Sequence, residues 1–582
     1  MKKIKKILAM LLAVVMVMGM CMTVFAEEGD NTTAPGTESS NDADGTPETV
    51  APPATGTEGS GGGNGTKPVE GDKATATVNN VEAGATVTAY RIVEPTYNDK
   101  GFTGYKLAEG VTLANMLEPT SDEVTGIAAN KILLATLTKE TLSALEGAAG
   151  LTTYTAKLNA GYWVVIVEGS DIQEVYNPML IGIYYSVEGS GDDNTLVNGT
   201  VDANSNWSLN STPAYAKSEK PTIDKKITGS TGKDTSDGNE SGNDVAIGDT
   251  VNFEIDTVIP SYSKSYTEVT VKIKDSMGKG LTLADPANLV VKVNGTEVKA
   301  GSDTFTYKED GDKKSFEISF ASVYALAHSG EKVVVTYDAV LGEDAGLNFD
   351  ANTNTAKLEY TNDPSGEKNE IEDKTYTYTF GIDANLFGSD GSGWNKFTEE
   401  LLKTGEVRKV ILESGEEVET TTLPGAEFTL TRADGKTYTT VSDENGYLSF
   451  TGLDAGTYTL QETKAPEGYS LNDTKIPVEI TATYNEDGTL NSYTIKVNNE
   501  NTSTYTATYD ANEKGKVTDI DCTPEHENDW SDVSDTHEIK NTKLAALPST
   551  GGIGTTIFTI GGCAIMIIAA GLFFATRRKA DK

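Results

Sequence analysis

The sequence predicts a secreted, mainly β protein of several β-sandwich domains in tandem, followed by one C-terminal transmembrane segment. Runs of β-branched and aromatic residues recur along the chain between turn residues, which is typical of sandwiches. Glycine is frequent (58 residues) and proline scarce (18), as expected for many tight turns. Between the two terminal segments about 520 residues remain, which predicts three or four domains at ~100–200 residues each.

The N-terminus carries the features of a secretory signal peptide. Lysines at positions 2, 3, 5 and 6 precede an apolar stretch, and Val24-Phe25-Ala26 offers a cleavage site after Ala26. Residues 27–73 consist largely of Thr, Gly, Ser, Pro, Glu and Asn, with almost no apolar side chains. This composition predicts a disordered lead between the signal peptide (1–26) and the first domain.

The C-terminus predicts a membrane anchor. An uncharged apolar run from about Ile553 to Thr576 is ~24 residues long, enough to cross a bilayer at ~1.5 Å per residue. The basic cluster at 577–579 should stay cytoplasmic, which places the preceding chain outside the cell. In front of the apolar run stands the pentapeptide Leu547-Pro548-Ser549-Thr550-Gly551.

Three domains are expected between these ends. The first covers residues 74–217 and includes a short helix at about 131–146, where apolar residues recur at helical spacing. The second covers residues 218–374 and the third residues 375–546, both with strand-like runs separated by turn signals. The remaining residues, 547–582, form the C-terminal anchor.

Charge and cysteine content limit the function classes. The formal net charge of −40 gives an acidic surface, which repels phosphates and disfavours nucleic-acid binding. Cys21 lies in the signal peptide and Cys563 in the apolar run, so Cys522 is alone in the ectodomain and has no partner for an intramolecular disulfide. A long extracellular β protein of this kind needs another means of stabilisation.

Few residues suggest catalysis. The three histidines, His328, His526 and His537, lie in no metal or nucleophile motif. The acidic segment 510–535 contains no coordination motif either. We therefore expect no enzyme activity, no cofactor and no bound metal.

One lysine in the second domain lies where a buried residue is expected. Ile223, Lys225 and Ile227 alternate with Asp224 and Lys226, so a strand would place Lys225 on the apolar face. An unpaired buried ammonium is costly. The pattern alone equally allows the opposite register, in which Lys225 is exposed.

The C-terminal order of motif, apolar span and basic tail resembles the LPxTG sorting signal of Gram-positive surface proteins. In that family a sortase cuts between threonine and glycine, here Thr550 and Gly551, and passes the acyl group of the threonine to an amine. The resemblance implies that the apolar span anchors the chain in the membrane only until the sortase cuts, and that the protein is finally attached to peptidoglycan.

Two domains resemble pilin modules. The third, through residues 423–430 and the "E-box" at 460–469, resembles a Cna B-type domain of SpaA-like major pilins. The second, through 221–227 and 354–360, resembles the fimbrial isopeptide-forming D2 domain. This family resemblance implies immunoglobulin-like sandwiches and a pilus shaft subunit. Its implied partners are a sortase and copies of itself in a head-to-tail polymer, with minor pilins and host surface ligands as further candidates.

In this family each such domain forms an intramolecular Lys–Asn isopeptide bond beside a buried acid. For the second domain the resemblance implies a bond between Lys225 and Asn354, with Asp275 as the acid. Asn352 is a competing candidate for the amide. The alternative for Asp275 is that it is an ordinary turn aspartate. Burial would keep the lysine neutral and the carboxyl protonated, so the amine can attack the amide carbon and release ammonia without a cofactor. Proximity can contribute ~7–11 kcal/mol.

For the third domain the resemblance implies the acid Glu462, the amide Asn541 and, as lysine, Lys403. Lys396 and Lys409 are the alternatives, because an insertion departs from the compact family pattern here. The alternative to a role as the acid is that Glu462 is an ordinary exposed strand residue.

A separate lysine would join subunits. In these pilins a lysine in a Trp…Val-Tyr-Pro-Lys context near the end of the first domain receives the threonine of the next subunit. Here Trp207 is followed by Tyr215-Ala216-Lys217, with alanine in place of proline. The resemblance implies that Lys217 is the acceptor and that growth is head to tail, which gives a filament. The alternatives are a solvated linker lysine and, for the whole protein, a monomeric wall-anchored adhesin.

Overall fold

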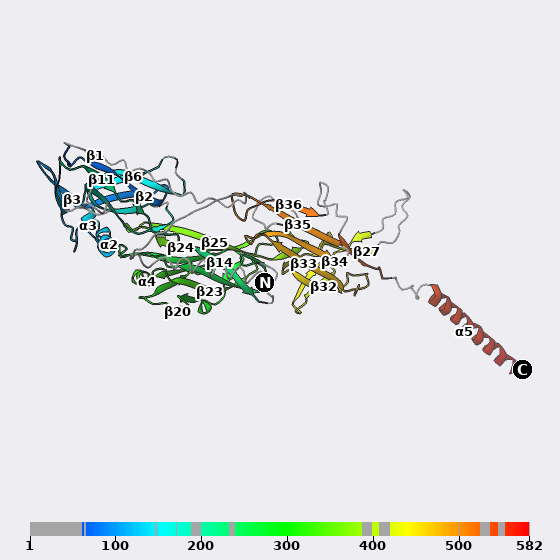
Figure 1. The fold of residues 1–582 in the computed structure, drawn as a ribbon. Helices are drawn as coiled ribbons and strands as arrows, with labels where there is room; N and C mark the ends of the chain where they lie inside the picture. The colour runs from blue at the N-terminus through cyan, green and yellow to red at the C-terminus, as the bar shows by residue number, and fades with distance from the viewer. Residues whose placement is uncertain are drawn as a thin grey trace, which may run out of the picture. The chain divides into compact units, whose positions relative to one another are not determined.

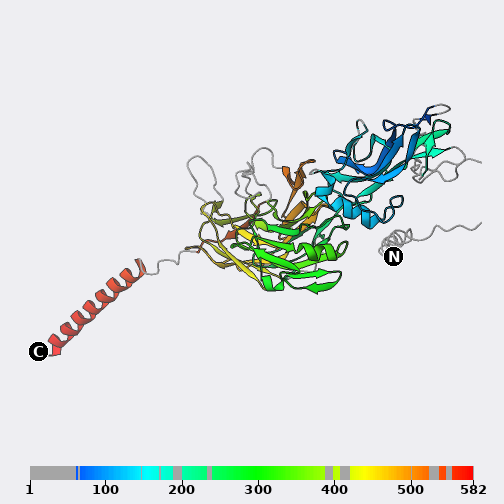
Figure 2. The same ribbon diagram turned by 90° about the vertical axis from the view of Figure 1, so that its left-hand side faces the viewer.

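The computed structural model describes most of the chain between residues 61 and 580 (Figures 1 and 2). The chain divides into two compact units, Met1–Gly56 and Thr57–Lys582, and all described residues belong to the second. The predicted signal peptide and the Leu547–Gly551 pentapeptide lie outside the described residues. The described ranges are 61–62, 66–145, 147, 149–169, 172–187, 199–231, 239–386, 398–406, 420–499, 501–523, 536–544 and 553–580.

The first domain is an eleven-stranded sheet in the described part of the chain, with order β1-β11-β9-β7-β3-β5-β6-β2-β12 and β4 and β10 attached beside β3. Inward residues alternate along its strands and form one apolar core. Its elements are β1 (Gly61–Gly62), β2 (Lys73–Glu82), β3 (Thr86–Asn98), β4 (Gly101–Leu107), α2 (Ser121–Ala129), α3 (Lys131–Leu134), β5 (Lys139–Ala144), β6 (Leu151–Asn159), β7 (Gly161–Glu168), β8 (Val175–Tyr176), β9 (Met179–Val187), β10 (Val201–Asp202), β11 (Trp207–Ser211), β12 (Ala214–Tyr215) and β13 (Ser218–Glu219).

Two expectations for this domain are wrong. The helix expected at 131–146 ends at Leu134, and Lys139–Ala144 is strand β5, because its register with β3 buries Leu142. The longer helix, α2, begins ten residues earlier, at Ser121, with a Thr120–Glu123 capping box. The predicted disordered lead, 27–73, extends too far toward the C-terminus. Within that range β1 pairs with β11, and the buried Trp207 indole donates to Thr66 O at 2.9 Å.

The second domain, as far as its residues are described, is a sandwich of two six-stranded sheets that enclose an apolar core. One sheet has the order β14-β16-β23-β19-β20 with β18 beside β23, and the other has the order β15-β25-β24-β17-β22-β21. Strand β25 crosses the domain boundary expected at 374, and Tyr376 and Tyr378 pack into the third core. The elements are β14 (Ile223–Ser230), β15 (Gly242–Asp244), β16 (Thr250–Val258), β17 (Val271–Met277), β18 (Leu281–Leu283), η2 (Pro286–Asn288), β19 (Val290–Val293), β20 (Thr296–Val298), β21 (Phe305–Glu309), β22 (Ser315–Phe320), α4 (Ser322–Ala327), β23 (Lys332–Leu341), β24 (Asn352–Thr361) and β25 (Lys368–Tyr378).

In its described residues the third domain contains a seven-stranded sheet, β30-β29-β32-β33-β34-β35-β36, and a three-stranded sheet, β28-β27-β37, in which β27 and β37 run parallel. Figure 1 shows β32 to β36 side by side. The elements are β26 (Phe380–Ile382), β27 (Leu401–Glu406), β28 (Thr420–Thr422), β29 (Glu427–Arg432), β30 (Thr437–Val441), β31 (Phe450–Leu453), β32 (Gly456–Lys464), β33 (Ile476–Tyr484), β34 (Leu490–Val497), β35 (Asn501–Tyr509), β36 (Val517–Thr523) and β37 (His537–Asn541).

A single helix, α5 (Ile553–Ala580), occupies the predicted apolar run. Within the described part of the chain, no helix combines the length and the apolar character needed to cross a membrane. The transmembrane span expected from about Ile553 to Thr576 therefore stays a prediction.

Candidate functional site

The second-domain site is built from both sheets of the sandwich. Lys225 lies on β14 and pairs with Ile255, which settles the register in favour of burial: 1% of the lysine is exposed. Asp275 on β17 and Asn354 on β24 lie on neighbouring strands, two positions apart in register, so both side chains point to the same face. Tyr337 on β23 completes a cluster of four buried polar side chains.

Short contacts join all four side chains. Lys225 Nζ lies 2.5 Å from Asp275 Oδ2 and also contacts the Tyr337 hydroxyl. That hydroxyl donates to Asp275 Oδ2 at 2.8 Å and accepts from Asn354 Nδ2 at 2.9 Å. The lysine and the amide expected from the sequence therefore meet around one carboxyl and one phenol.

Burial acts on both ionisable partners in opposite directions. It lowers the pKa of Lys225, although the Asp275 carboxylate opposes this. It raises the pKa of Asp275, although Lys225 opposes that as well. Both shifts favour a neutral amine beside a protonated carboxyl. Oδ1 of Asp275 and Oδ1 of Asn354 are both buried and have no hydrogen-bond partner among the described residues. A protonated carboxyl would add a donor that a carboxylate lacks.

The competing amide, Asn352, serves a structural purpose. It is buried, and its side chain accepts from Gly346 N at 2.9 Å and donates to Gly346 O and Thr377 O at 3.1 Å each. These bonds fix the turn before β24 and use both ends of the amide. Asn354, two positions later, is the amide that faces Lys225.

The third-domain site assembles the three residues expected there. Lys403 on β27 and Asn541 on β37 come from parallel neighbouring strands, and Glu462 comes from β32. Lys403 Nζ lies 2.5 Å from Asn541 Oδ1 and 3.2 Å from Glu462 Oε1. Asn541 Nδ2 donates to the same Oε1 at 2.8 Å, and all three side chains are buried.

The surroundings orient this second cluster. Asn472 N donates to Glu462 Oε2 at 2.8 Å, which holds the carboxyl with its other oxygen toward the amide. Burial lowers the pKa of Lys403, and the ring of Phe428 lies 5.3 Å from its Nζ. The alternative lysines, Lys396 and Lys409, lie outside the described residues.

The lysine expected to join subunits is at the surface. Lys217 is exposed between β12 and β13, and its backbone O accepts from Asn177 N at 3.2 Å. Tyr215, two residues before it, is 58% exposed. Thr550, the other residue expected to react, lies outside the described residues.

Sequence reasoning missed Tyr337 and a pair of buried acids. Val333, Val335 and Tyr337 alternate inward along β23, so the hydroxyl position in the core could have been inferred from the period of two. The buried Asp383 accepts from the backbone N–H groups of Glu400 and Leu448, among others. These two acids, Asp383 and Glu400, had no motif to reveal them.

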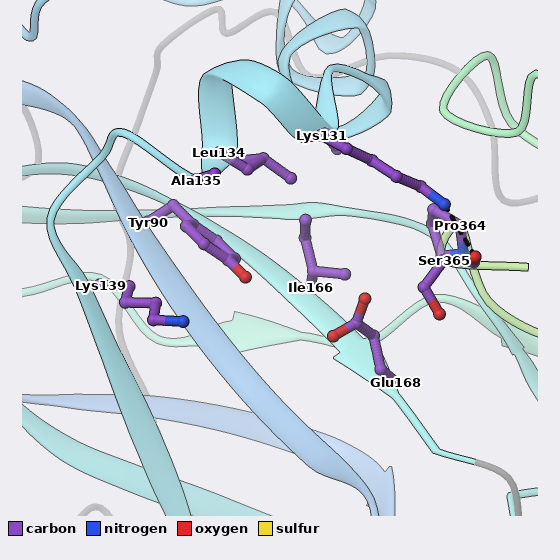
Figure 3. A pocket seen from close by; sticks show the side chains of 10 residues that line it. Tyr90, Lys131, Leu134, Ala135, Lys139, Ile166, Glu168, Pro364 and Ser365 are labelled. Carbon is purple, nitrogen blue, oxygen red and sulfur yellow. Dashed lines mark hydrogen bonds between the residues drawn. The ribbon is translucent and has the colours of Figure 1, made fainter. Parts of the chain in front are cut away.

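One pocket lies away from both clusters. A cavity of about 230 Å³ opens beside α3, where Lys131 Nζ donates to Ser365 O at 2.7 Å (Figure 3). Figure 3 also shows Tyr90, Lys139 and Glu168 along its wall. Burial raises the pKa of Glu168. This cavity contains none of the residues expected to react.

Known protein families match along most of the chain. The models matched are the T6 antigen Ig-like domain (residues 71–218), the Gram-positive pilin backbone subunit 2, Cna-B-like domain (247–364), the SpaA prealbumin-like fold domain (408–494) and the LPXTG cell wall anchor motif (539–582). The Trypsin-resistant surface T6 protein of Streptococcus pyogenes serotype M6 is 30% identical over 558 residues, which cover 88% of this chain and 96% of that protein. The solved T6 backbone pilin of the same serotype is 24% identical, covers 81% of this chain and 99% of its own, and has a TM-score of 0.55, which shows a shared fold.

These modules and the anchor define a surface protein attached to the cell wall of a Gram-positive bacterium. The chain belongs to the family of Gram-positive pilin backbone proteins that includes the T6 protein. It is a structural subunit of a pilus backbone, as the sequence resemblance predicted.

Proposed function

We propose that the chain forms the shaft of a covalently polymerised pilus and that each subunit carries two intramolecular isopeptide bonds, Lys225–Asn354 and Lys403–Asn541. The observation that carries this proposal is that the second and third domains each bring a lysine, an asparagine and an acid from three separate strands into one buried cluster. Such an arrangement is costly unless it has a purpose, because unpaired polar groups destabilise a core.

The chemistry requires only the side chains present. The neutral lysine Nζ attacks Cγ of the asparagine, the Cγ–Nδ2 bond breaks, and the amide nitrogen leaves as ammonia after one net proton transfer from Nζ. In the third domain Glu462 Oε1 contacts both nitrogens and can carry that proton. The role of the chain is then that of a sortase substrate with self-forming cross-links, and no enzyme activity or cofactor is required.

The positions of the two bonds suit a fibre under tension. Lys225 lies on the first strand of its domain, shortly after Lys217, and Lys403 and Asn541 lie on strands near the two ends of the third domain. A pull between Lys217 and Thr550 would pass through β14, across the first cross-link to β24, and then through β27 and across the second to β37. Covalent bonds, instead of hydrogen bonds between strands, would then resist unfolding of both domains.

Subunits would be joined by a third kind of bond, between Thr550 of one copy and Lys217 of the next. The exposed position of Lys217 gives a sortase access to its amine. The proposed partners are therefore a sortase, further copies of the chain, peptidoglycan at the base, and minor pilins or host ligands.

The polymer is tested by an immunoblot of wall material released by a muramidase and boiled in SDS, from cells that express a pilin sortase. Wild type should give a high-mass ladder, and Lys217→Ala should give a single monomer band. The control is Lys220→Ala, which changes a second exposed lysine three positions further along the chain and should give the wild-type ladder. A ladder that persists in Lys217→Ala would move the acceptor elsewhere. A monomer band in wild type would favour the adhesin.

A further inference from the structure

Tyr337 lies in the second-domain cluster but has no role in the Lys–Asn–acid pattern. Its hydroxyl contacts Lys225 Nζ, accepts from Asn354 Nδ2 at 2.9 Å and donates to Asp275 Oδ2 at 2.8 Å. We propose that Tyr337 is a catalytic residue of Lys225–Asn354 bond formation and relays the proton that the amine loses to the amide nitrogen that leaves. This inference rests on the proposed function, because it concerns the same cross-link.

The stoichiometry of the reaction defines what a relay must do. As Nζ of neutral Lys225 bonds to Cγ of Asn354, Nζ must lose one proton, and Nδ2 must gain one before it departs with the electron pair of the broken C–N bond. The Tyr337 oxygen contacts both nitrogens. The hydroxyl proton turns from Asp275 Oδ2 toward Nδ2 and passes to it while the oxygen takes the proton from Nζ. The phenol is thereby regenerated and ammonia leaves.

The surroundings keep the phenol in place and protonated. Its ring stacks on Phe253 with centroids 5.4 Å apart and meets Phe316 edge-on at 4.9 Å. Burial raises the pKa of Tyr337 well above its ordinary value. The hydroxyl is thus a proton donor that is restored after each transfer, and Asp275 remains available to donate to the amide oxygen.

The third domain shows why the second domain needs this hydroxyl. There, Glu462 Oε1 contacts Lys403 Nζ at 3.2 Å and Asn541 Nδ2 at 2.8 Å, so one carboxyl oxygen connects both nitrogens. Asp275 is one methylene shorter than a glutamate. Its Oδ2 contacts the lysine directly, and although Asn354 also hydrogen-bonds with Asp275, the Tyr337 oxygen contacts both nitrogens.

The test compares Tyr337→Phe with a matched control, Tyr360→Phe, by linked-peptide mass spectrometry during cell-free synthesis of the ectodomain. Tyr360 is buried in the same domain, and its hydroxyl donates to Gln173 O at 2.5 Å, away from the reacting groups. Tyr337→Phe should form the Lys225–Asn354 bond ~100-fold more slowly or not at all, the size expected for loss of a proton-transfer group. The control should form it at the wild-type rate, and both variants should form the third-domain bond normally.

A second variant separates relay from packing. In Asp275→Glu/Tyr337→Phe, the longer acid can reach both nitrogens as Glu462 does, so bond formation should return without the hydroxyl. Wild-type speed in Tyr337→Phe would overturn the inference, as would failure of the double variant to restore the bond in a second domain whose circular dichroism matches wild type. Absence of both linked peptides in wild type would instead overturn the proposed function.

Discussion

Removal of the third-domain cross-link should lower the stability of that domain by an amount the structure allows us to calculate. Lys403 and Asn541 are 138 positions apart, so the bond closes a large loop. In the chain-entropy model a loop of this size destabilises the unfolded state by about 5 kcal/mol. At ~2–4 °C per kcal/mol for a domain of this size, Asn541→Ala should lower the third-domain Tm by ~10–20 °C.

Scanning calorimetry of the ectodomain measures this shift directly. The matched control is Asn352→Ala, which removes an equally buried amide with three hydrogen bonds and no lysine partner. That control should cost only the lost bonds, about 1–3 kcal/mol in the second domain. If Asn541→Ala lowers Tm no more than Asn352→Ala does, the wild-type third domain contains no covalent loop and the reasoning is refuted.

Three further perturbations test the surrounding structure. Burial raises the pKa of Glu400 above its unfolded value, so its contribution to the third-domain unfolding free energy should be full below ~pH 4 and fall as pH rises toward the folded pKa, by up to about 1.4 kcal/mol per pH unit. Glu400→Gln should reduce that slope in denaturant titrations at several pH values, and the neighbouring Asp383, whose pKa burial also raises, should account for the rest. Arg432 Nη1 contacts Asp249 at 3.1 Å and Asp454 at 3.3 Å, and the arginine side chain is 10% exposed. Arg432→Met should therefore lower the unfolding free energy by about 2–3 kcal/mol. An unchanged denaturant midpoint would show that the ion pairs contribute nothing. Thr120→Ala removes the capping box of α2 and should cost about 1 kcal/mol of first-domain stability in the same assay, with Thr120→Ser as the control that retains the cap.

The lysines of the two buried clusters were predictable to different degrees. The period of two along residues 223–227 allowed Lys225 to face either way, and only the pairing of β14 with β16 decided it. Lys403 was one of three candidates, because the insertion around it obscured where the first strand of its domain begins. In both domains the acid and the amide followed from motifs, and their meeting depends on strand order that the sequence does not state.

Other features escaped because they depend on distant contacts. The sequence pattern predicts Tyr337 only as one more inward residue of an apolar strand. Its partners Asp275 and Asn354 lie on the facing sheet, which the sequence does not show. The segment at 131–146 has helical spacing, but pairing with β3 and β6 turns its second half into a strand. Local pattern gave the type of most elements, whereas tertiary pairing decided these exceptions.

Whether the two buried clusters react can be measured as the intact mass of the purified wild-type ectodomain. We expect a mass lower than the sequence mass by two ammonia molecules, with one ammonia recovered in Glu462→Ala and one in Asn354→Ala after correction for each substitution. A wild-type mass equal to the sequence mass would show that neither bond forms.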